Sequence, residues 1–290
     1  MMKEVTSRVV IEAPLDCSGT SRGEERAPAV LRGAGLLERV GADARNDTEA
    51  RIRVSRRDPA TGVIGADDVR RASAAIAAAV REALVEGRRP LVVGGDCTVL
   101  LGVFLGLPRG MRLWFVDGHP DFLDGETSPT GEAADMDLAI LTGHGPPGLL
   151  GSAGTLVDPG SVVLLGHRPD HLSPDVASEN ARIDPAIRAL IALEIRERGA
   201  GAVGEEIAAD NPTQPTWLHL DLDVLDVQAL PAVTYRQPLG LDWDEFVALV
   251  GPLAAADGLV GVSVADFNPD LDPDGEHSRR VVDALGAVLR

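Results

Sequence analysis

Acidic and imidazole side chains follow directly after an apolar run near the middle of the chain. Residues 113–116 (L-W-F-V) lack polar alternation, which is typical of a strand covered on both faces in a parallel sheet. Asp117, His119 and Asp121 come next, each separated from the following one by a single residue. If the backbone stays extended, the three side chains point to one side and suit a divalent cation. A polar strand end that only makes turn hydrogen bonds would have the same pattern.

A second acidic pair favours the metal site. Residues 216–226 (T-W-L-H-L-D-L-D-V-L-D) again have the character of a strand, and Asp221 and Asp223 are two residues apart. Unpaired carboxylates are costly to bury, and few basic residues stand near either stretch. Strands of an open α/β sheet bring their carboxyl ends to one edge, so a shared metal centre there would compensate both groups of charges.

Three short motifs, in order, resemble the signatures of the ureohydrolase family, which includes arginase, agmatinase and related amidinohydrolases. The family's G-G-D-H-S, D-A-H-x-D and S-x-D-x-D-x-x-D-P motifs correspond here to residues 94–98 (G-G-D-C-T), 117–121 (D-G-H-P-D) and 219–227 (H-L-D-L-D-V-L-D-V). Residues 21–37 and 264–269 resemble the family's early loop with its first helix and its E-x-N-P strand end. The resemblance extends over nearly the whole chain. It implies one domain, residues 1–290, with the three-layer α/β/α sandwich and mostly parallel sheet of an arginase-like fold.

The resemblance also implies a set of site residues. Two divalent metal ions, usually manganese in the family, would share the bridging carboxylates Asp117 and Asp221. His119 and Asp223 would complete one position, and Cys97 with Asp121 the other; Asp121 is also a candidate catalytic residue. Asp266 stands where the family has a glutamate that pairs with the substrate's guanidinium.

The chain departs from the family pattern at three of these places. Cys97 replaces a metal-binding histidine, Ala134 stands where a histidine shuttles protons, and Asp266 is one methylene shorter than glutamate. A thiolate near a helix amino terminus is favoured by the helix dipole and is a softer ligand than imidazole, so we expect zinc, iron, cobalt or nickel to gain on manganese. His144, in a glycine-proline loop, is a weaker candidate for a catalytic role, since a lone histidine there is more often a surface group.

Several further elements must position these residues. Strands are expected at residues 8–11, 89–95, 161–166 and 259–264. Helices are expected at residues 66–87, 135–141, 243–253 and 278–289. Two further helices are expected to begin at residue 27 or 28 and at residue 97 or 98. Residues 181–199 alternate charged and apolar positions in helical fashion, and 205–215 read as a polar connection. The loops 124–134 and 166–173 are expected to form the side-chain pocket of the substrate.

Composition narrows the classes of partner. A formal net charge of −18 argues against nucleic acid or an anionic membrane and mildly favours a cationic substrate. No signal core or long apolar run is present, so we expect a cytoplasmic protein. The two cysteines are too few for a disulfide framework, and Cys17 has no histidine or acidic cluster beside it in the sequence, which favours a structural or incidental role.

These observations lead to one main hypothesis and two alternatives. The main hypothesis is a metal-dependent hydrolase that cleaves a C–N bond of a guanidino or amidino compound with metal-activated hydroxide. Because of Ala134 and Asp266, we expect that compound to differ from arginine. The alternatives are thiol-based amidine or acyl chemistry at Cys97, and a catalytically silent homologue that binds a ligand or a partner. The resemblance further implies a homo-oligomer, either a trimer or a hexamer.

Overall fold

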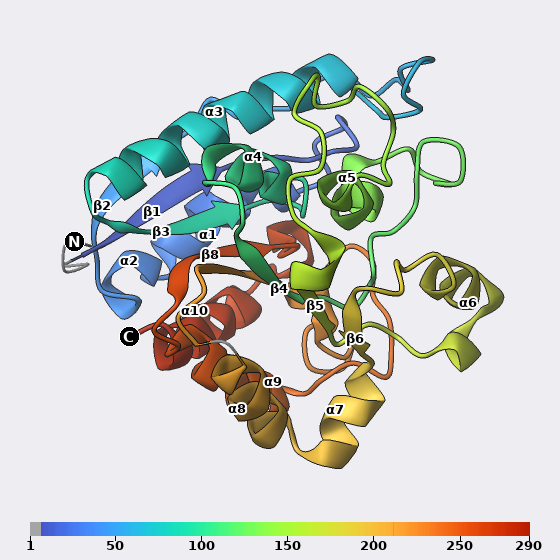
Figure 1. Ribbon diagram of the computed structural model, residues 1–290. Helices are drawn as coiled ribbons and strands as arrows, with labels where there is room; N and C mark the ends of the chain where they lie inside the picture. Colours follow the sequence, from blue (N-terminus) through green and yellow to red (C-terminus); the bar gives the residue numbers. More distant parts are fainter. Residues whose placement is uncertain (1–6, 211) are drawn as a thin grey trace.

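A single sheet organises the protein. The computed structural model describes residues 7–210 and 212–290, and its strands form an eight-stranded sheet in the order β2-β1-β3-β8-β7-β4-β5-β6 (Figure 1). Every neighbouring pair of strands is parallel. The strands are β1 (Arg8–Ala13), β2 (Ala42–Asp47), β3 (Arg89–Gly94), β4 (Arg112–Val116), β5 (Val162–Leu165), β6 (Arg188–Leu190), β7 (Thr216–Asp221) and β8 (Leu259–Ala265).

Helices cover both faces of the sheet, so the predicted three-layer sandwich with a parallel sheet is confirmed (Figure 1). The helices are α1 (Ala27–Gly33), α2 (Leu36–Arg39), α3 (Ala66–Val85), α4 (Val99–Gly106), α5 (Asp137–Thr142), α6 (Pro174–Asn180), α7 (Ala192–Arg198), α8 (Ala200–Ala209), α9 (Trp243–Ala254) and α10 (Glu276–Val288). One core cluster joins the sheet to α3, α4 and α5, and the other joins it to α1, α2 and α7–α10. Alternate strand residues feed the two clusters, as the pleat requires: Leu91 and Val93 belong to one, Val92 to the other.

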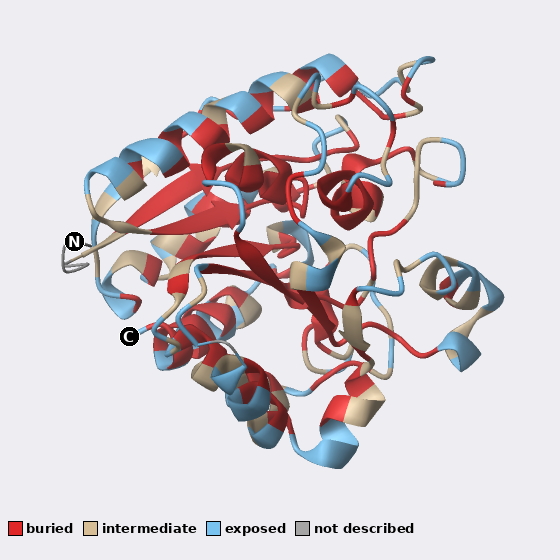
Figure 2. Ribbon diagram, in the orientation of Figure 1, coloured by how far each residue is buried: buried red, intermediate tan, exposed pale blue. Residues whose placement is uncertain are grey.

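Amphipathic patterning accounts for the outer layers. Helix α3 turns Val69, Ile76 and Val80 toward the sheet and exposes the opposite stripe to water, which Figure 2 shows as alternating buried and exposed bands. Gly87, with φ of 75°, follows the end of this helix as the sequence predicted. Helix α9 begins with a capping box in which Asp242 accepts a hydrogen bond from a backbone N–H of the first turn.

Two predicted segments were wrong. The helical pattern at residues 181–199 instead contains strand β6, which pairs with β5 at the edge of the sheet, and α7 begins only at Ala192. The polar connection at 205–215 is helical in its first part, because α8 extends to Ala209. Strand β2 was not predicted. It lies at the other edge with alternately half-buried and exposed residues, so its sequence carries little apolar signal.

The central strands bring the predicted site residues to one edge of the sheet. Strands β3, β8, β7 and β4 are consecutive neighbours. At or just beyond their carboxyl ends lie Cys97, Asp266, Asp221 and Asp117, one from each strand. Parallel strands place these ends side by side, so residues far apart in the chain meet at this edge.

The backbone beyond β4 is not extended, contrary to expectation. Strand β4 ends at Val116, and Asp121 has a φ of 47°, in the left-handed region. Asp266 has a φ of 65° and donates its backbone N–H to the Gly95 oxygen at 2.6 Å. Non-glycine residues in this conformation are uncommon and cluster at functional sites. Local turns of the backbone, and not the alternation of side chains along a strand, therefore orient the carboxylates of Asp121 and Asp266.

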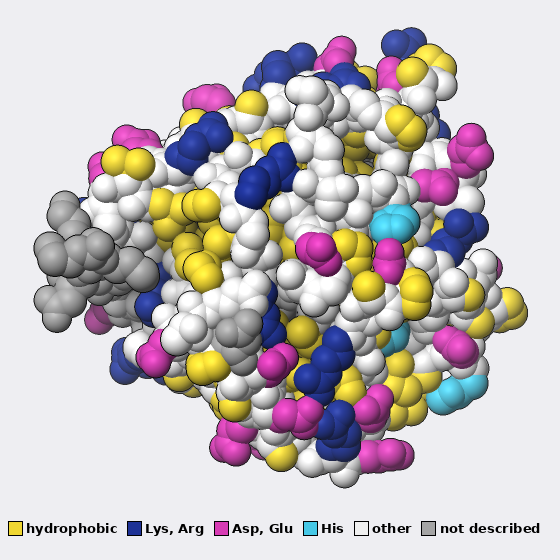
Figure 3. All heavy atoms as spheres, in the orientation of Figure 1, with side chains coloured by type: hydrophobic (Ala, Val, Ile, Leu, Met, Phe, Trp, Pro, Cys, Tyr) yellow, Lys and Arg dark blue, Asp and Glu magenta, His cyan; other side chains and the backbone are white. Residues whose placement is uncertain are grey.

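The surface carries both signs of charge. On the face drawn in Figure 3, arginine and acidic side chains are interspersed without a broad cationic patch. Within the described ranges, no helix has the length and apolar character needed to span a membrane.

Gly95 offers a test of how closely the turn at residues 94–98 packs against its neighbours. A Cβ atom there would lie 1.8 Å from the backbone oxygen of Leu15, so Gly95→Ala must displace the turn that carries Cys97. We expect this variant to lower the free energy of unfolding by about 2 kcal/mol or more, measured by urea denaturation. The control is Gly33→Ala at the end of α1, where a Cβ meets nothing within 4 Å; it should stabilise by about 0.5–1 kcal/mol. Unchanged stability of Gly95→Ala would contradict the described turn.

Candidate metal centre

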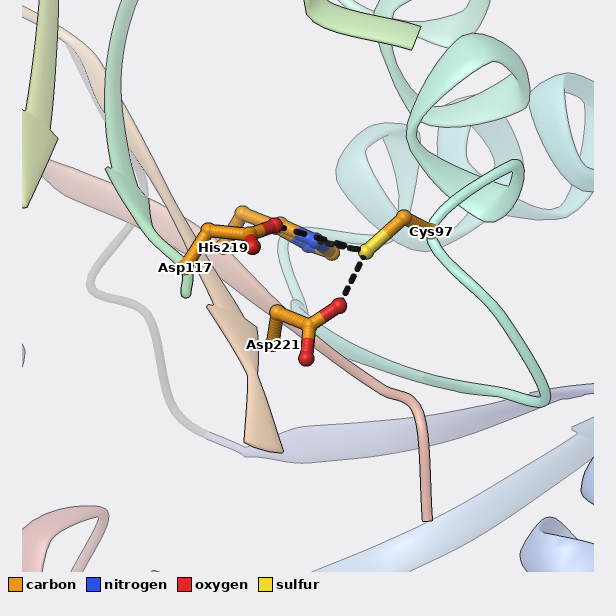
Figure 4. Close-up of side chains that lie close together, drawn as sticks. All are labelled: Cys97, Asp117, His219 and Asp221. Carbon is orange, nitrogen blue, oxygen red and sulfur yellow. Dashed lines mark hydrogen bonds between the residues drawn. The ribbon is translucent and has the colours of Figure 1, made fainter. Parts of the chain in front are cut away.

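Cys97 lies at the middle of a buried cluster of polar side chains. Its Sγ is 2.7 Å from Asp221 Oδ2, 3.2 Å from Asp266 Oδ2 and 3.7 Å from Asp117 Oδ2. The residue is only 1% exposed. Figure 4 shows Cys97, Asp117, Asp221 and His219 pointing toward one another. The structure thus brings together side chains from all three sequence motifs.

One ligand group consists of Asp117, His119 and Asp223, whose donor atoms all lie within 4.8 Å of one another. His119 Nδ1 is 2.8 Å from Asp223 Oδ2. Burial alone would lower the pKa of His119, but the Asp223 carboxylate raises it above its ordinary value. For Asp223 the effects are opposite: burial alone would raise the pKa of the carboxyl group, but the positive charges of His119 and Arg168 lower it below the ordinary value. These three residues are the ones that the sequence assigned to one metal position.

A second ligand region surrounds the thiol. One set consists of Cys97, Asp121 and Asp137, and another of Cys97, Asp117, His219 and Asp221; in each set the donor atoms lie within 4.8 Å of one another. Cys97 and Asp121, the two residues predicted for the second position, thus lie close together; their role as ligands remains a prediction. Asp137 and His219 were not predicted as ligands.

The two missed residues differ in the signal they gave. His219 precedes Asp221 by two residues on strand β7, so strand alternation places it on the same side as the predicted ligand. That signal was present in the sequence. Asp137 opens helix α5 and is fully buried, and its position in the chain resembles an ordinary helix start.

Burial makes this cluster electrostatically costly without cations. It raises the pKa of Asp117, Asp121, Asp221 and Asp266 well above the ordinary value, and neighbouring carboxylates raise each of them further. Burial also raises the pKa of the Cys97 thiol, as do Asp221 and Asp266. The expectation that the helix dipole favours a thiolate is therefore wrong for the metal-free protein, because desolvation and like charges outweigh the dipole. Oxygen, imidazole and thiol donors in this arrangement fit divalent cations.

A cavity of about 160 Å³ opens beside these ligands. Its walls include Cys97, His119, Asp121, Asp221, Asp223 and Asp266. The predicted loop 124–134 contributes Pro129, Thr130, Glu132 and Ala134. The other predicted loop, 166–173, contributes none of the lining residues, so that part of the pocket prediction was wrong.

Arg168 explains why that second loop stays out of the cavity. Its guanidinium is buried and donates to the backbone oxygens of Asp223 at 2.8 Å and Leu225 at 3.0 Å. Arg168 therefore holds the turn that carries Asp223 instead of facing a substrate. His144 also lies outside the cavity lining, with its Nε2 3.2 Å from Asp184 Oδ2.

Three side chains of the cavity lining are joined by hydrogen bonds. Arg22 donates to both carboxylate oxygens of Glu132 at 2.9 Å, and the Tyr235 hydroxyl donates to Glu132 Oε2 at 3.0 Å. Arg22 also lies 3.4 Å from Glu24 and 3.5 Å from Asp16. Its positive charge is therefore fully compensated by carboxylates of the protein.

Cys17 lies close to more carboxylate groups than its neighbours in the sequence indicate. It is buried, lines the cavity, and has its Sγ 3.5 Å from Glu132 Oε2. Its backbone N–H donates to Asp96 Oδ2 at 2.6 Å. Burial raises the pKa of the Cys17 thiol, and Asp96 and Glu132 add to this effect. Tertiary contacts thus supply the acidic cluster that the local sequence lacks.

Comparisons with known proteins give the same picture of the fold and the family. Residues 6–289 match the model described as the arginase family. The arginase of Bacillus caldovelox is 30% identical over 294 residues, which cover 97% of each protein. The solved arginase of Bacillus subtilis superposes with a TM-score of 0.84 at 25% identity, over 98% of both chains. The proclavaminate amidino hydrolase of Streptomyces clavuligerus has the same fold, with a TM-score of 0.68 at 20% identity, over 99% of this chain and 92% of that one.

A parallel α/β/α sandwich with candidate metal-ligand side chains at the carboxyl ends of its central strands defines the class of protein. The chain belongs to the arginase family, and its homologues are hydrolases. The resemblance drawn from three short motifs is confirmed.

The buried carboxylates generate a pH prediction for the metal-free protein. The pKa of these carboxyl groups in the folded chain lies above their ordinary value of 3.8. At any pH between the ordinary pKa and the raised pKa, the folded chain therefore binds more protons than the unfolded chain. The free energy of unfolding should therefore fall as the pH rises from about 5 to 8. In the double variant Asp117→Asn/Asp221→Asn, the free energy of unfolding should fall less over this pH range, by on the order of 2 kcal/mol. Urea unfolding at pH 5 and at pH 8 measures the difference.

The same double variant tests the ligand assignment. Wild-type protein should bind divalent metal and regain stability at pH 8, whereas the double variant should bind none at the cluster. Asp226→Asn is the matched control, because Asp226 belongs to the same motif but caps a turn through the N–H of Gln228 at 2.9 Å. Equal metal content and equal pH dependence in all three proteins would show that the site lies elsewhere.

Proposed function

We propose that this protein is a metal-dependent hydrolase that cleaves a C–N bond in a small guanidino or amidino compound other than arginine. The observation that carries the proposal is the meeting of several ligand groups beside one cavity: Asp117 with His119 and Asp223, and two groups around Cys97, one with Asp121 and Asp137 and one with Asp117, His219 and Asp221. These residues, Asp117 and Asp221 among them, would hold two divalent ions. Membership of the arginase family supports the reaction class.

The protein's own residues have distinct parts in this reaction. Divalent cations supply a water nucleophile of lowered pKa near neutral pH. Asp121 lines the cavity beside Cys97 and is placed to hold a proton during attack. Asp266 also faces the cavity, and its carboxylate can pair with a guanidinium or amidinium group. These groups would orient the trigonal carbon and stabilise the cationic leaving amine.

The cavity favours a compact substrate without a carboxylate. A cavity of about 150 Å³ holds a molecule the size of benzene, and this one, at about 160 Å³, is of that order. Among the residues that the structure describes, Arg22 is the only arginine or lysine that lines the cavity, and Glu132 already binds that guanidinium through both oxygens. A substrate carboxylate would therefore meet an acidic wall with no uncompensated cation. Arginine carries such a carboxylate on a long chain.

The alternative in which Cys97 acts as a nucleophile has less support. Its sulfur lies among three carboxylates, and burial with Asp221 and Asp266 raises the pKa of the thiol. The thiolate that such chemistry needs is disfavoured unless a cation lies beside it. A homologue that only binds a ligand is separated from an enzyme by the activity assay below. A homo-oligomer remains a prediction of the family resemblance, and a cytoplasmic location remains a prediction from the sequence.

The proposed function is tested by measuring urea or amide release together with bound metal. Purified protein would be loaded with manganese, zinc, cobalt or nickel and offered a series of guanidino and amidino compounds of increasing length. We expect release with at least one compact compound, and loss of release in Asp117→Asn with Asp221→Asn. Protein that is fully loaded with metal but releases nothing from any compound would contradict the proposed hydrolase.

Glu132 provides a prediction about substrate charge. In Glu132→Gln the Arg22 guanidinium loses its bidentate partner, so carboxylate-bearing guanidino compounds should gain about tenfold in kcat/KM relative to compact carboxylate-free ones. In the wild type, kcat/KM for arginine should be the lowest of the series. Glu126→Gln is the control, because Glu126 lies in the same loop but is exposed. Efficient arginine turnover by the wild type, or no change in preference in Glu132→Gln, would contradict this selectivity.

A further inference from the structure

The residue closest to Cys97 that the family motifs leave without a role is His219. It lies on strand β7, is 0% exposed, and places its Nε2 3.1 Å from Cys97 Sγ. Figure 4 shows the imidazole edge directed at the sulfur, with Asp117 and Asp221 on either side. The family motifs quoted above have histidine at the position of Cys97 and serine at the position of His219. In this chain the imidazole therefore enters the same cluster from the neighbouring strand.

The other ring nitrogen of His219 is anchored. Its Nδ1 lies 2.7 Å from the hydroxyl of Ser263 on β8, and the same hydroxyl accepts the indole N–H of Trp217 at 2.9 Å. Histidines that bind metal typically donate their second nitrogen to such a partner, which fixes the tautomer and the ring orientation. A serine oxygen has two lone pairs and can accept from both rings. When Nδ1 donates its hydrogen to Ser263, Nε2 is free to act as a ligand.

The distances also suit coordination. The donor atoms of Cys97, Asp117, His219 and Asp221 all lie within 4.8 Å of one another. With bonds of about 2.3 Å to sulfur and about 2.0 Å to nitrogen, a tetrahedral zinc ion separates these two donors by about 3.5 Å. The Sγ to Nε2 distance of 3.1 Å needs only a small side-chain movement to reach that value.

We propose that His219 is a metal ligand and that, with Cys97, it gives one of the two metal positions a nitrogen and sulfur donor pair. The inference rests on the metal centre of the proposed function but not on any substrate. Sulfur and imidazole donors favour zinc, cobalt or nickel over manganese. The other position, with His119 and carboxylates, keeps the oxygen-rich character that suits manganese. The two positions therefore differ in the metal they prefer.

Cobalt titration of the metal-free, full-length protein tests this ligand assignment. Cobalt bound to Cys97 should give a sulfur-to-metal charge-transfer band, which Cys97→Ser should remove. In His219→Ala, cobalt affinity at the sulfur-bearing position should fall by more than the roughly tenfold expected for Ser263→Ala, which removes only the anchor. His144→Ala is the control, because His144 lies outside the cavity lining, and it should bind as the wild type does.

One alternative explains the same contact without coordination. If Ser263 donates its hydrogen to Nδ1, then Nε2 carries a hydrogen and donates it to the sulfur. His219→Ala would then raise the pKa of the thiol, measured from its rate of alkylation, while cobalt affinity and the charge-transfer band stayed as in the wild type. That result would overturn the proposal.

A second measurement covers the case in which His219→Ala does not fold. His119→Asn removes the other histidine of the cluster, so any imidazole bound to zinc in that variant must come from His219. X-ray absorption of zinc-loaded His119→Asn should show sulfur and imidazole around the same ion. Sulfur without imidazole would overturn the proposal. These spectra decide the assignment whether or not the protein releases urea, so they separate it from the proposed hydrolysis.

Discussion

The structure depends on a concentration of carboxylates that its own basic residues do not neutralise. Asp121, Asp221 and Asp266 gather around the Cys97 thiol, and within the described ranges none of the three forms an ion pair with a basic side chain. The guanidinium of Arg168, the nearest arginine in this region, is directed at backbone oxygens. An uncompensated buried charge costs several kcal/mol, so such a cluster is stable only if it stays protonated or holds cations.

The sheet explains how the chain maintains this costly arrangement. Four neighbouring strands each deliver one polar side chain to the same edge, and one of those residues, Asp266, has a left-handed backbone conformation. The layers on both faces exclude water and so strengthen every electrostatic interaction at that edge. A site of this kind binds cations firmly and selects a substrate by charge. In the proposed function, the compensated pair of Arg22 and Glu132 in the cavity wall would extend the same selectivity to the rest of the substrate.

Much of this could be predicted from the sequence, since the apolar runs and the motifs that follow them mark the central strands. The two strands at the edges of the sheet were harder to predict. Strand β6 has only three residues and depends on pairing with β5, and β2 is half exposed, so neither has a strong local pattern. The position of Asp121 was expected for the wrong reason, because a left-handed turn and not an extended strand orients it. His219 could have been predicted from strand alternation, whereas Asp137 joins the cluster only through tertiary packing. The hydrogen-bonded group of Arg22, Glu132 and Tyr235 in the cavity wall depends on contacts between residues about one hundred or more positions apart, which local patterns do not carry.

The central claim is that cations, and not protons, balance this cluster in the working protein. It is tested most directly by titrating divalent metal into the metal-free protein at pH 7 and counting the protons that are released, by calorimetry in buffers of different ionisation enthalpy. Because burial and neighbouring carboxylates raise the pKa of Asp117, Asp121, Asp221, Asp266 and the Cys97 thiol, binding of two equivalents should release more than one proton per protein. Binding without proton release, or no binding at all, would contradict the claim.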